Sequence, residues 1–219
     1  MDSKIITAIL LFAFVVSAVG LLIPTENPPS MQTFPWQINV NSNGTTQVFG
    51  LNLGESTLQQ AEQVFGATAE LSLFEPVPGQ GQRGVEAYFD KVNIGGLSAR
   101  VVMVMSFTSE QLRNMFERGV RISTLGDGSR KVTLHADDIT QVRVTPVHTI
   151  TYLPRIRLES ELLEKRFGKP EQLITEPDTG AQHWLYPKLG LDIALDKNNN
   201  AVFQYIAPEN FEQLLEPLK

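Results

Sequence analysis

The sequence predicts an α+β fold made of two tandem helix–antiparallel-sheet repeats behind a single N-terminal transmembrane helix. Three observations lead to this prediction: an uncharged apolar run near the N-terminus, a Pro-rich stretch after it, and two similar series of helix and strand patterns about a hundred residues apart. The predicted boundaries are 1–23 for the anchor, 24–35 for a linker, 36–123 for the first repeat and 124–219 for the second.

The anchor is predicted from residues 5–23, IITAILLFAFVVSAVGLLI, which carry no charge. At about 1.5 Å per helical residue, such a run nearly crosses a hydrocarbon core of roughly 30 Å. Lys4 and the terminal amine outweigh Asp2, which predicts a cytoplasmic N-terminus and a body on the other side. The alternative is a signal peptide cleaved after Ala18, but the apolar run continues past this residue, which favours the anchor.

The linker, residues 24–35, reads PTENPPSMQTFP and has four prolines in twelve residues. Prolines at this density favour an extended, semi-stiff chain. We therefore expect a spacer that holds a folded body, beginning at about Trp36, away from the membrane.

The first helix of the first repeat is predicted from GESTLQQAEQVFG, residues 54–66. Ser56 and Gln59 form a capping-box pattern at its start. Gly66 suits the left-handed residue that ends a helix. The apolar positions share one helical face: Leu58, Ala61 and Phe65.

The corresponding helix of the second repeat is predicted from LESELLEKRFGKP, with Leu163 and Phe167 four residues apart, Gly168 as its stop and Pro170 beyond. Each repeat also closes on a helix with the same apolar spacing. The matching residues, each pair 99 apart, are Leu112 and Phe211, Met115 and Leu214, and Phe116 and Leu215. This constant offset favours an internal duplication.

Strands are predicted between these helices. The first repeat offers VEAYFDKV and ARVVMVMSF, and the second offers HWLYP, LDIALD and AVFQYI. In LDIALD, Asp192 alternates with apolar residues, which predicts one buried and one wet face. Residues 196–200, DKNNN, are predicted to form a hairpin turn. The stretch KVTLHADDITQVRVTPVHTITYL is expected to add further strands.

These motifs resemble the SmpA/OmlA, or BamE-like, envelope domain, arranged in tandem as in the fold of the β-lactamase-inhibitor protein. In that pattern a Gly-x-Ser/Thr start leads into a helix with an apolar-Gly-x-Pro exit, and a Trp-x-Tyr strand follows. The matching residues are Gly54, Ser56, Phe65 and Gly66 in the first repeat and Phe167, Gly168, Pro170, Trp184 and Tyr186 in the second. BamE-like proteins are lipoproteins, whereas this chain has no Cys to lipidate. The resemblance implies a bacterial envelope module that binds another protein and has no enzymatic activity.

The composition excludes several function classes. The net charge is −6, with 24 acidic and 18 basic residues and no Lys/Arg run, so no nucleic-acid partner is expected. The chain has no cysteine, which excludes disulfides, thiol catalysis and cysteine-bound metals.

No motif predicts a catalytic, cofactor-binding or metal-binding residue. His135, Asp137 and Asp138 in HADD are expected to form a strand-end turn, because a metal site needs three or four converging ligands. His148 and His183 are isolated in sequence. GQGQRG, residues 79–84, lacks the Lys-Ser/Thr of a phosphate-binding loop and is expected to be a flexible hairpin loop. NGT, residues 43–45, is expected to be a hairpin turn, although it also matches a glycosylation acceptor.

The sequence thus predicts a non-enzymatic, membrane-anchored periplasmic protein-binding module without cofactors or metals. We expect a single-pass protein of a bacterial inner membrane, with a cytoplasmic N-terminus and a periplasmic body, serving as an accessory or assembly subunit of a membrane or envelope complex. The alternative is a periplasmic sensor of a small ligand or lipid, with its site in the cleft between the repeats.

Overall fold

The computed structural model of this chain describes residues 33–78 and 81–218. The predicted anchor, residues 1–23, and most of the predicted linker lie outside the described residues. Within the described ranges, no helix is both long and apolar enough to cross a membrane.

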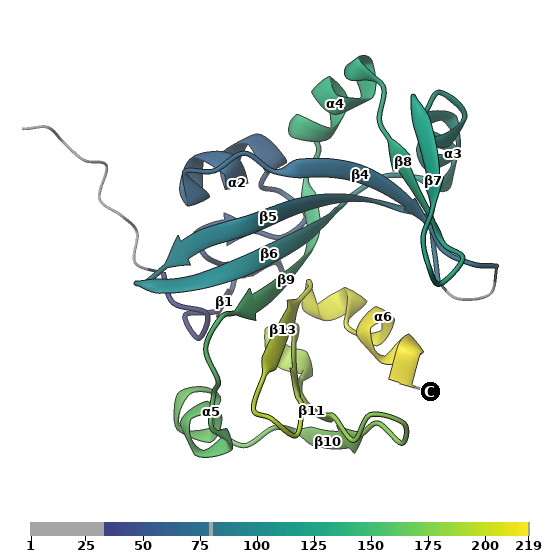
Figure 1. Cartoon of the computed structure of the whole chain (residues 1–219). Coiled ribbons are helices and arrows are strands. Elements are labelled where there is room, and N and C mark those ends of the chain that lie inside the picture. The colour runs from purple at the N-terminus through teal and green to yellow at the C-terminus, as the bar shows by residue number, and fades with distance from the viewer. Residues whose placement is uncertain (1–32, 79–80, 219) are drawn as a thin grey trace, which may run out of the picture. The chain divides into compact units, whose positions relative to one another are not determined.

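Ten antiparallel strands form one continuous sheet, in the spatial order β10-β11-β12-β13-β9-β6-β5-β4-β8-β7 (Figure 1). Its strands are β4 (Glu70–Glu75), β5 (Gly84–Ile94), β6 (Leu97–Met105), β7 (Arg121–Thr124), β8 (Arg130–Thr133), β9 (Val147–Pro154), β10 (Gln172–Thr175), β11 (Gln182–Tyr186), β12 (Leu191–Leu195) and β13 (Ala201–Tyr205). A separate three-stranded sheet contains β1 (Asn39–Val40), β2 (Thr46–Val48) and β3 (Leu51–Asn52).

The prediction of two tandem repeats behind a transmembrane helix is wrong. Strand β9 pairs with β6 on one side, with Met103 opposite Ile150, and with β13 on the other, with Phe203 opposite Tyr152. Because β9 hydrogen-bonds to both neighbours, the strands of the two halves form a single, mainly antiparallel β structure. The sequence did not reveal this, because strand partners cannot be assigned from local alternation.

The helices of the described residues are short. They are α2 (Leu58–Phe65), α3 (Ser109–Glu117), α4 (Ala136–Arg143), α5 (Ser160–Phe167) and α6 (Glu212–Leu215), with the 3-10 turns η1 (Pro187–Leu189), η2 (Pro208–Asn210) and η3 (Glu216–Leu218). The predicted ends at Gly66 and Gly168 are confirmed, and Gly66 is left-handed at φ 61°.

The capping box of α2 lies one residue later than predicted. The Thr57 hydroxyl accepts a hydrogen bond from the Gln60 backbone N–H at 3.4 Å, and the Gln60 side chain accepts one from the Thr57 N–H at 2.9 Å. Ser56 is engaged elsewhere, because its hydroxyl accepts a hydrogen bond from the Asn52 N–H at 3.0 Å.

Two strand predictions also need correction. Residues 136–143 form α4 instead of a strand, and His135 caps this helix by accepting a hydrogen bond from the Asp137 N–H. Asp192 is fully buried, so the second face of β12 is not wet. The hairpin turns predicted at Asn43–Thr45 and Asp196–Asn200 are confirmed.

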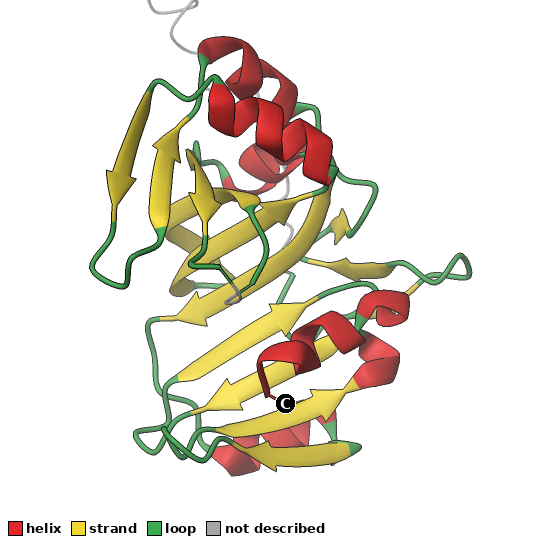
Figure 2. Cartoon of the chain, turned by 90° about the vertical axis from the view of Figure 1, so that its right-hand side faces the viewer, coloured by secondary structure: helices red, strands yellow, loops and turns green. Residues whose placement is uncertain are grey.

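The large sheet has a core face and an opposite, open face, and the side chains of β5 are buried on the first and more exposed on the second. Val85, Ala87 and Phe89 are buried on the core face, where Phe89 meets Phe65 of α2. Helix α5 also packs on the core face, through contact of Phe167 with Tyr186. Helix α6 packs on the open face (Figure 2), where Leu185, Ile206 and Phe211 form a second small core.

An aromatic cluster on the core face links the small sheet to the large one. The ring of Phe49 lies 5.4 Å from that of Tyr152 and 5.6 Å from that of Tyr205. Phe49 has φ 53° and is followed by Gly50 at φ 76°, so a tight turn between β2 and β3 directs its side chain into the core. Burial raises the pKa of Tyr152 to about 12. The Tyr205 hydroxyl donates a hydrogen bond to the Pro35 carbonyl at 2.9 Å, which fastens the start of the described chain.

We expect Phe49→Ala to lower the free energy of unfolding by about 3–5 kcal/mol, because it leaves a cavity among buried rings. Val144→Ala is the control: Val144 is 61% exposed, so the change should stay within about 0.5 kcal/mol. Urea unfolding followed by circular dichroism measures both. Similar midpoints for the two variants would show that the cluster does not hold the sheets together.

Candidate functional site

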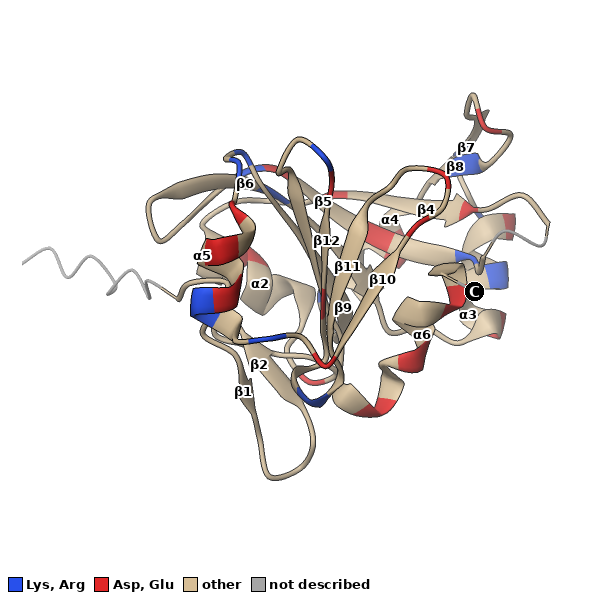
Figure 3. Ribbon diagram, turned by 90° about the horizontal axis from the view of Figure 1, so that it is seen from below, with Lys and Arg blue, Asp and Glu red and all other residues tan. Residues whose placement is uncertain are grey.

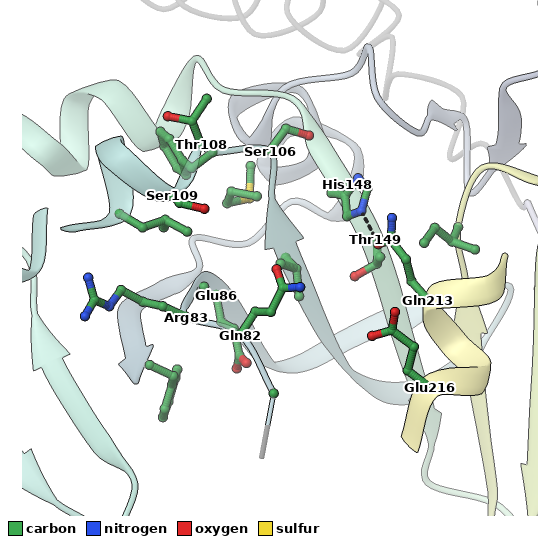
Figure 4. A pocket seen from close by; sticks show the side chains of 18 of the residues that line it. Gln82, Arg83, Glu86, Ser106, Thr108, Ser109, His148, Thr149, Gln213 and Glu216 are labelled. Atoms are coloured by element: carbon green, nitrogen blue, oxygen red, sulfur yellow. Dashed lines mark hydrogen bonds between the residues drawn. The ribbon is translucent and has the colours of Figure 1, made fainter. Parts of the chain in front are cut away.

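The described part of the chain contains an open groove of about 1510 Å³ (Figure 4). The start of α3 and the loop before β5 bound it on one side, and α6 with η3 bounds it on the other. Its floor consists of the ends of β5, β6 and β9, at Glu86, Val104 and Thr149.

Local structure holds each wall in place. Helix α3 begins with a capping box, in which the Gln111 side chain accepts a hydrogen bond from the Thr108 N–H at 2.9 Å. Helix α6 is short, so its position depends on burial of Phe211 against Leu185 and Ile206. A hydrogen bond of 3.0 Å between His148 Nε2 and Gln213 Oε1 joins the start of β9 to α6 inside the groove (Figure 4).

Arg83 is the basic residue among those that line the groove, and it is already engaged. Its guanidinium forms an ion pair with Glu75 and lies 4.6 Å above the ring of Phe116. A guanidinium held by a carboxylate and an aromatic face is oriented and electrically neutralised.

Glu86 is the half-buried carboxylate of the floor. Burial raises its pKa, and the charge of Lys131 opposes that shift. The Lys131 ammonium is bound to Glu70, at 2.8 Å. Within the described ranges, no hydrogen bond or ion pair joins Glu86 to another residue.

The groove combines hydroxyl groups, two carboxylates without an ion pair to a described residue (Glu86 and Glu216) and apolar side chains, a lining that suits the binding of a ligand or partner. The hydroxyl groups of its lining are those of Ser106, Thr108, Ser109 and Thr149. His148 is bonded to an amide and not to one of these hydroxyls, so it is not arranged as their base. No set of three His, Asp or Glu side chains within residues 33–78 and 81–218 could hold a metal ion.

The motifs weighed in the sequence lie in different places. His135 and Asp137 share the start of α4, whereas Asp138 is buried and forms an ion pair with Arg118 at the end of α3. The hydrogen bond that the Arg118 guanidinium donates to the Asp138 carboxylate raises the pKa of Arg118. His148 reaches the groove, and so do Gln82 and Arg83 of the GQGQRG loop. Sequence reasoning missed Glu86, because alternation along β5 does not show that the open face is left uncovered there.

His183 occupies a second polar cluster, which the sequence also did not predict. It is 6% exposed, with Nδ1 2.7 Å from Asp192 and Nε2 3.0 Å from Glu176. Both ring nitrogens therefore donate to carboxylates, and the hydrogen bond to Asp192 is the main cause that raises the pKa of His183. The Glu176 pKa is lowered by hydrogen bonds from Thr179 and then from His183. The cluster links β11 to β12 and to the residue that follows β10.

Trp184 and Tyr186 share the core face of β11. They are 7% and 4% exposed, and the Tyr186 hydroxyl donates to the Gly168 carbonyl at 2.9 Å. Burial raises the pKa of Tyr186 to about 12. These aromatic residues therefore belong to the core and not to a binding patch.

No family model, curated protein or solved structure matches this chain. The SmpA/OmlA likeness therefore stays a prediction from the sequence, and the groove is the basis for inferring function.

We expect His183→Gln to destabilise the protein in a pH-dependent way. A raised folded pKa gives stabilisation that is complete below the unfolded value near 6.5 and is lost as pH rises through the folded pKa. The lowered Glu176 pKa adds stabilisation that is present above about 4.5 and lost at lower pH. The difference in unfolding free energy between wild type and variant should therefore be largest between these values and shrink at alkaline pH.

Urea unfolding at a series of pH values measures this difference. His135→Gln is the control, because His135 lies at an exposed helix start, 46% accessible at its side chain. A His183→Gln difference that is constant with pH, or that grows as pH rises, would contradict the charged state assigned to His183.

Proposed function

We propose that this chain is a protein-binding module, an accessory or assembly subunit of a membrane or envelope complex, and that the groove beside α6 is its contact surface. The observation that carries the proposal is the groove itself, which is large, open and lined by both apolar and polar side chains. Interfaces between proteins combine such an apolar centre with a polar rim.

The dimensions of the groove favour a polypeptide partner over a small molecule. Small-molecule sites are usually concave pockets of roughly 300–1,000 Å³ that enclose most of the ligand. At about 1510 Å³, and open to solvent, this groove exceeds that range. It would leave a small ligand largely exposed, whereas an extended segment or a loop could fill it.

The cellular placement is part of the same proposal. It rests on the uncharged residues 5–23, which predict attachment to a membrane with the body on its outer side, and on the resemblance to the SmpA/OmlA domain, which implies a bacterial inner membrane and the periplasm. A module held beside a membrane protein needs little intrinsic affinity, because attachment to the same surface raises its effective concentration.

Site-specific photo-crosslinking in cells tests the proposal. A photoreactive phenylalanine analogue replaces Gln213, which is exposed and lines the groove, in the full-length chain with a C-terminal tag. The matched control replaces Gln63, an exposed glutamine of α2, the helix that packs on the core face. We expect one membrane or envelope protein to be captured in near-stoichiometric yield from position 213 and not from position 63.

Two results would contradict the proposal. Equal capture from both positions would mean that the groove is not the contact surface. A clean protein without crosslinks would shift the function to a small-ligand or lipid sensor. The intact mass of the purified chain also reports whether residues 1–18 remain attached.

A further inference from the structure

The charged groups of the groove are predominantly acidic. Three carboxylates line it, from Glu75, Glu86 and Glu216, against the single guanidinium of Arg83. Because Arg83 is paired with Glu75, the charges of Glu86 and Glu216 remain uncompensated by the lining. The groove therefore presents a negative potential to whatever enters it.

Glu86 is the focus of this potential. On β5 it lies between Ser72 of β4 and Val104 of β6, neither of which can neutralise it. It is half-buried and has no hydrogen bond or ion pair with another described residue. The charge of Lys131 favours the ionised form of Glu86, but the Lys131 ammonium forms its ion pair with Glu70 and not with Glu86. A carboxylate that is partly removed from water without a direct hydrogen bond or ion pair is costly, and a cation that binds it would offset this cost.

The surroundings of Glu86 suit the long aliphatic stem of a basic side chain. Phe74 and Val104 flank it on the floor, and Leu214 of α6 lies in the facing wall. Lys and Arg side chains pack their methylene groups on such surfaces while the charged head reaches a carboxylate. The segment 208–218, which forms this wall, carries three Glu and no basic residue (Figure 3).

We infer that the occupant of the groove is an extended polypeptide segment with a Lys or Arg side chain that forms an ion pair with Glu86. This inference rests on the proposed function and adds the chemistry of the partner. The hydroxyl and amide groups along the groove hydrogen-bond the segment, and the basic side chain fixes its register. An acidic segment is repelled by Glu86 and Glu216 together.

Three fluorescently labelled nonapeptides test the inference. They share Val-Thr flanks and differ in the central residue, which is Lys, Gln or Glu. Their binding to the full-length chain in neutral detergent micelles is followed by fluorescence anisotropy at low salt. We expect the Lys peptide to bind at least about tenfold more tightly than the Gln peptide and the Glu peptide to bind most weakly.

Glu86→Gln keeps the shape of the side chain and removes its charge. It should abolish the preference for the Lys peptide, and Glu86→Lys should reverse the order of the Lys and Glu peptides. The matched control is Glu117→Gln, an exposed carboxylate of α3 outside the groove lining, which should keep the wild-type order. Circular dichroism verifies that each variant is folded.

Three results would overturn the inference. They are equal binding of the three peptides, an unchanged preference in Glu86→Gln, and no binding of the Lys peptide at about 1 mM. Each is separable from failure of the proposed function. If crosslinking at position 213 captures a partner while the peptides show no charge preference, the groove binds protein but does not read a basic side chain.

Discussion

The backbone of β9 has hydrogen-bonding neighbours on both sides, and the rest of the body depends on this arrangement. Strand β6 pairs with it along Ala99–Met105, and β13 pairs with it through Phe203–Tyr205. The neighbouring strands supply hydrogen-bond partners for the backbone N–H and C=O groups of β9, which would be costly to bury unpaired. Ile150 and Tyr152 point to the core face and are fully buried, so separation of the two halves would expose both.

The same strand connects the core to the candidate site. Its centre carries Tyr152, which contacts the rings of Phe49 and Phe203, and its first residues carry His148 and Thr149 to the floor of the groove. Ladder pairs fix the floor of the groove, with Glu86 opposite Val104 and Val104 opposite Thr149. Binding there would require little ordering of the backbone, which lowers the entropic cost of association.

Much of the local structure could be predicted from residue patterns, and the failures have physical causes. The helix end at Gly66 follows from a short-range apolar period and a residue that tolerates positive φ. The β-branched residues of 136–143 predict a strand, but this segment is a helix that His135 caps and that Asp138 anchors to Arg118. Alternation along β12 predicts a wet face for Asp192, but Asp192 is fully buried and its carboxylate is bound by His183 of β11. Neither the residues around His183 nor those around Asp192 indicate in the sequence that these two side chains will pair.

By itself, the sequence determined the positions of most helices and of the hairpin turns at Asn43–Thr45 and Asp196–Asn200. These features depend on residues within about one helical turn or one strand, so local patterns report them. Only the tertiary structure decided that the two halves share one sheet, that His183 lies between Glu176 and Asp192, and that Glu86 lies in a groove without a direct hydrogen bond or ion pair to a described residue. Such features depend on strand order and register, which are set by burial of side chains far apart in the chain.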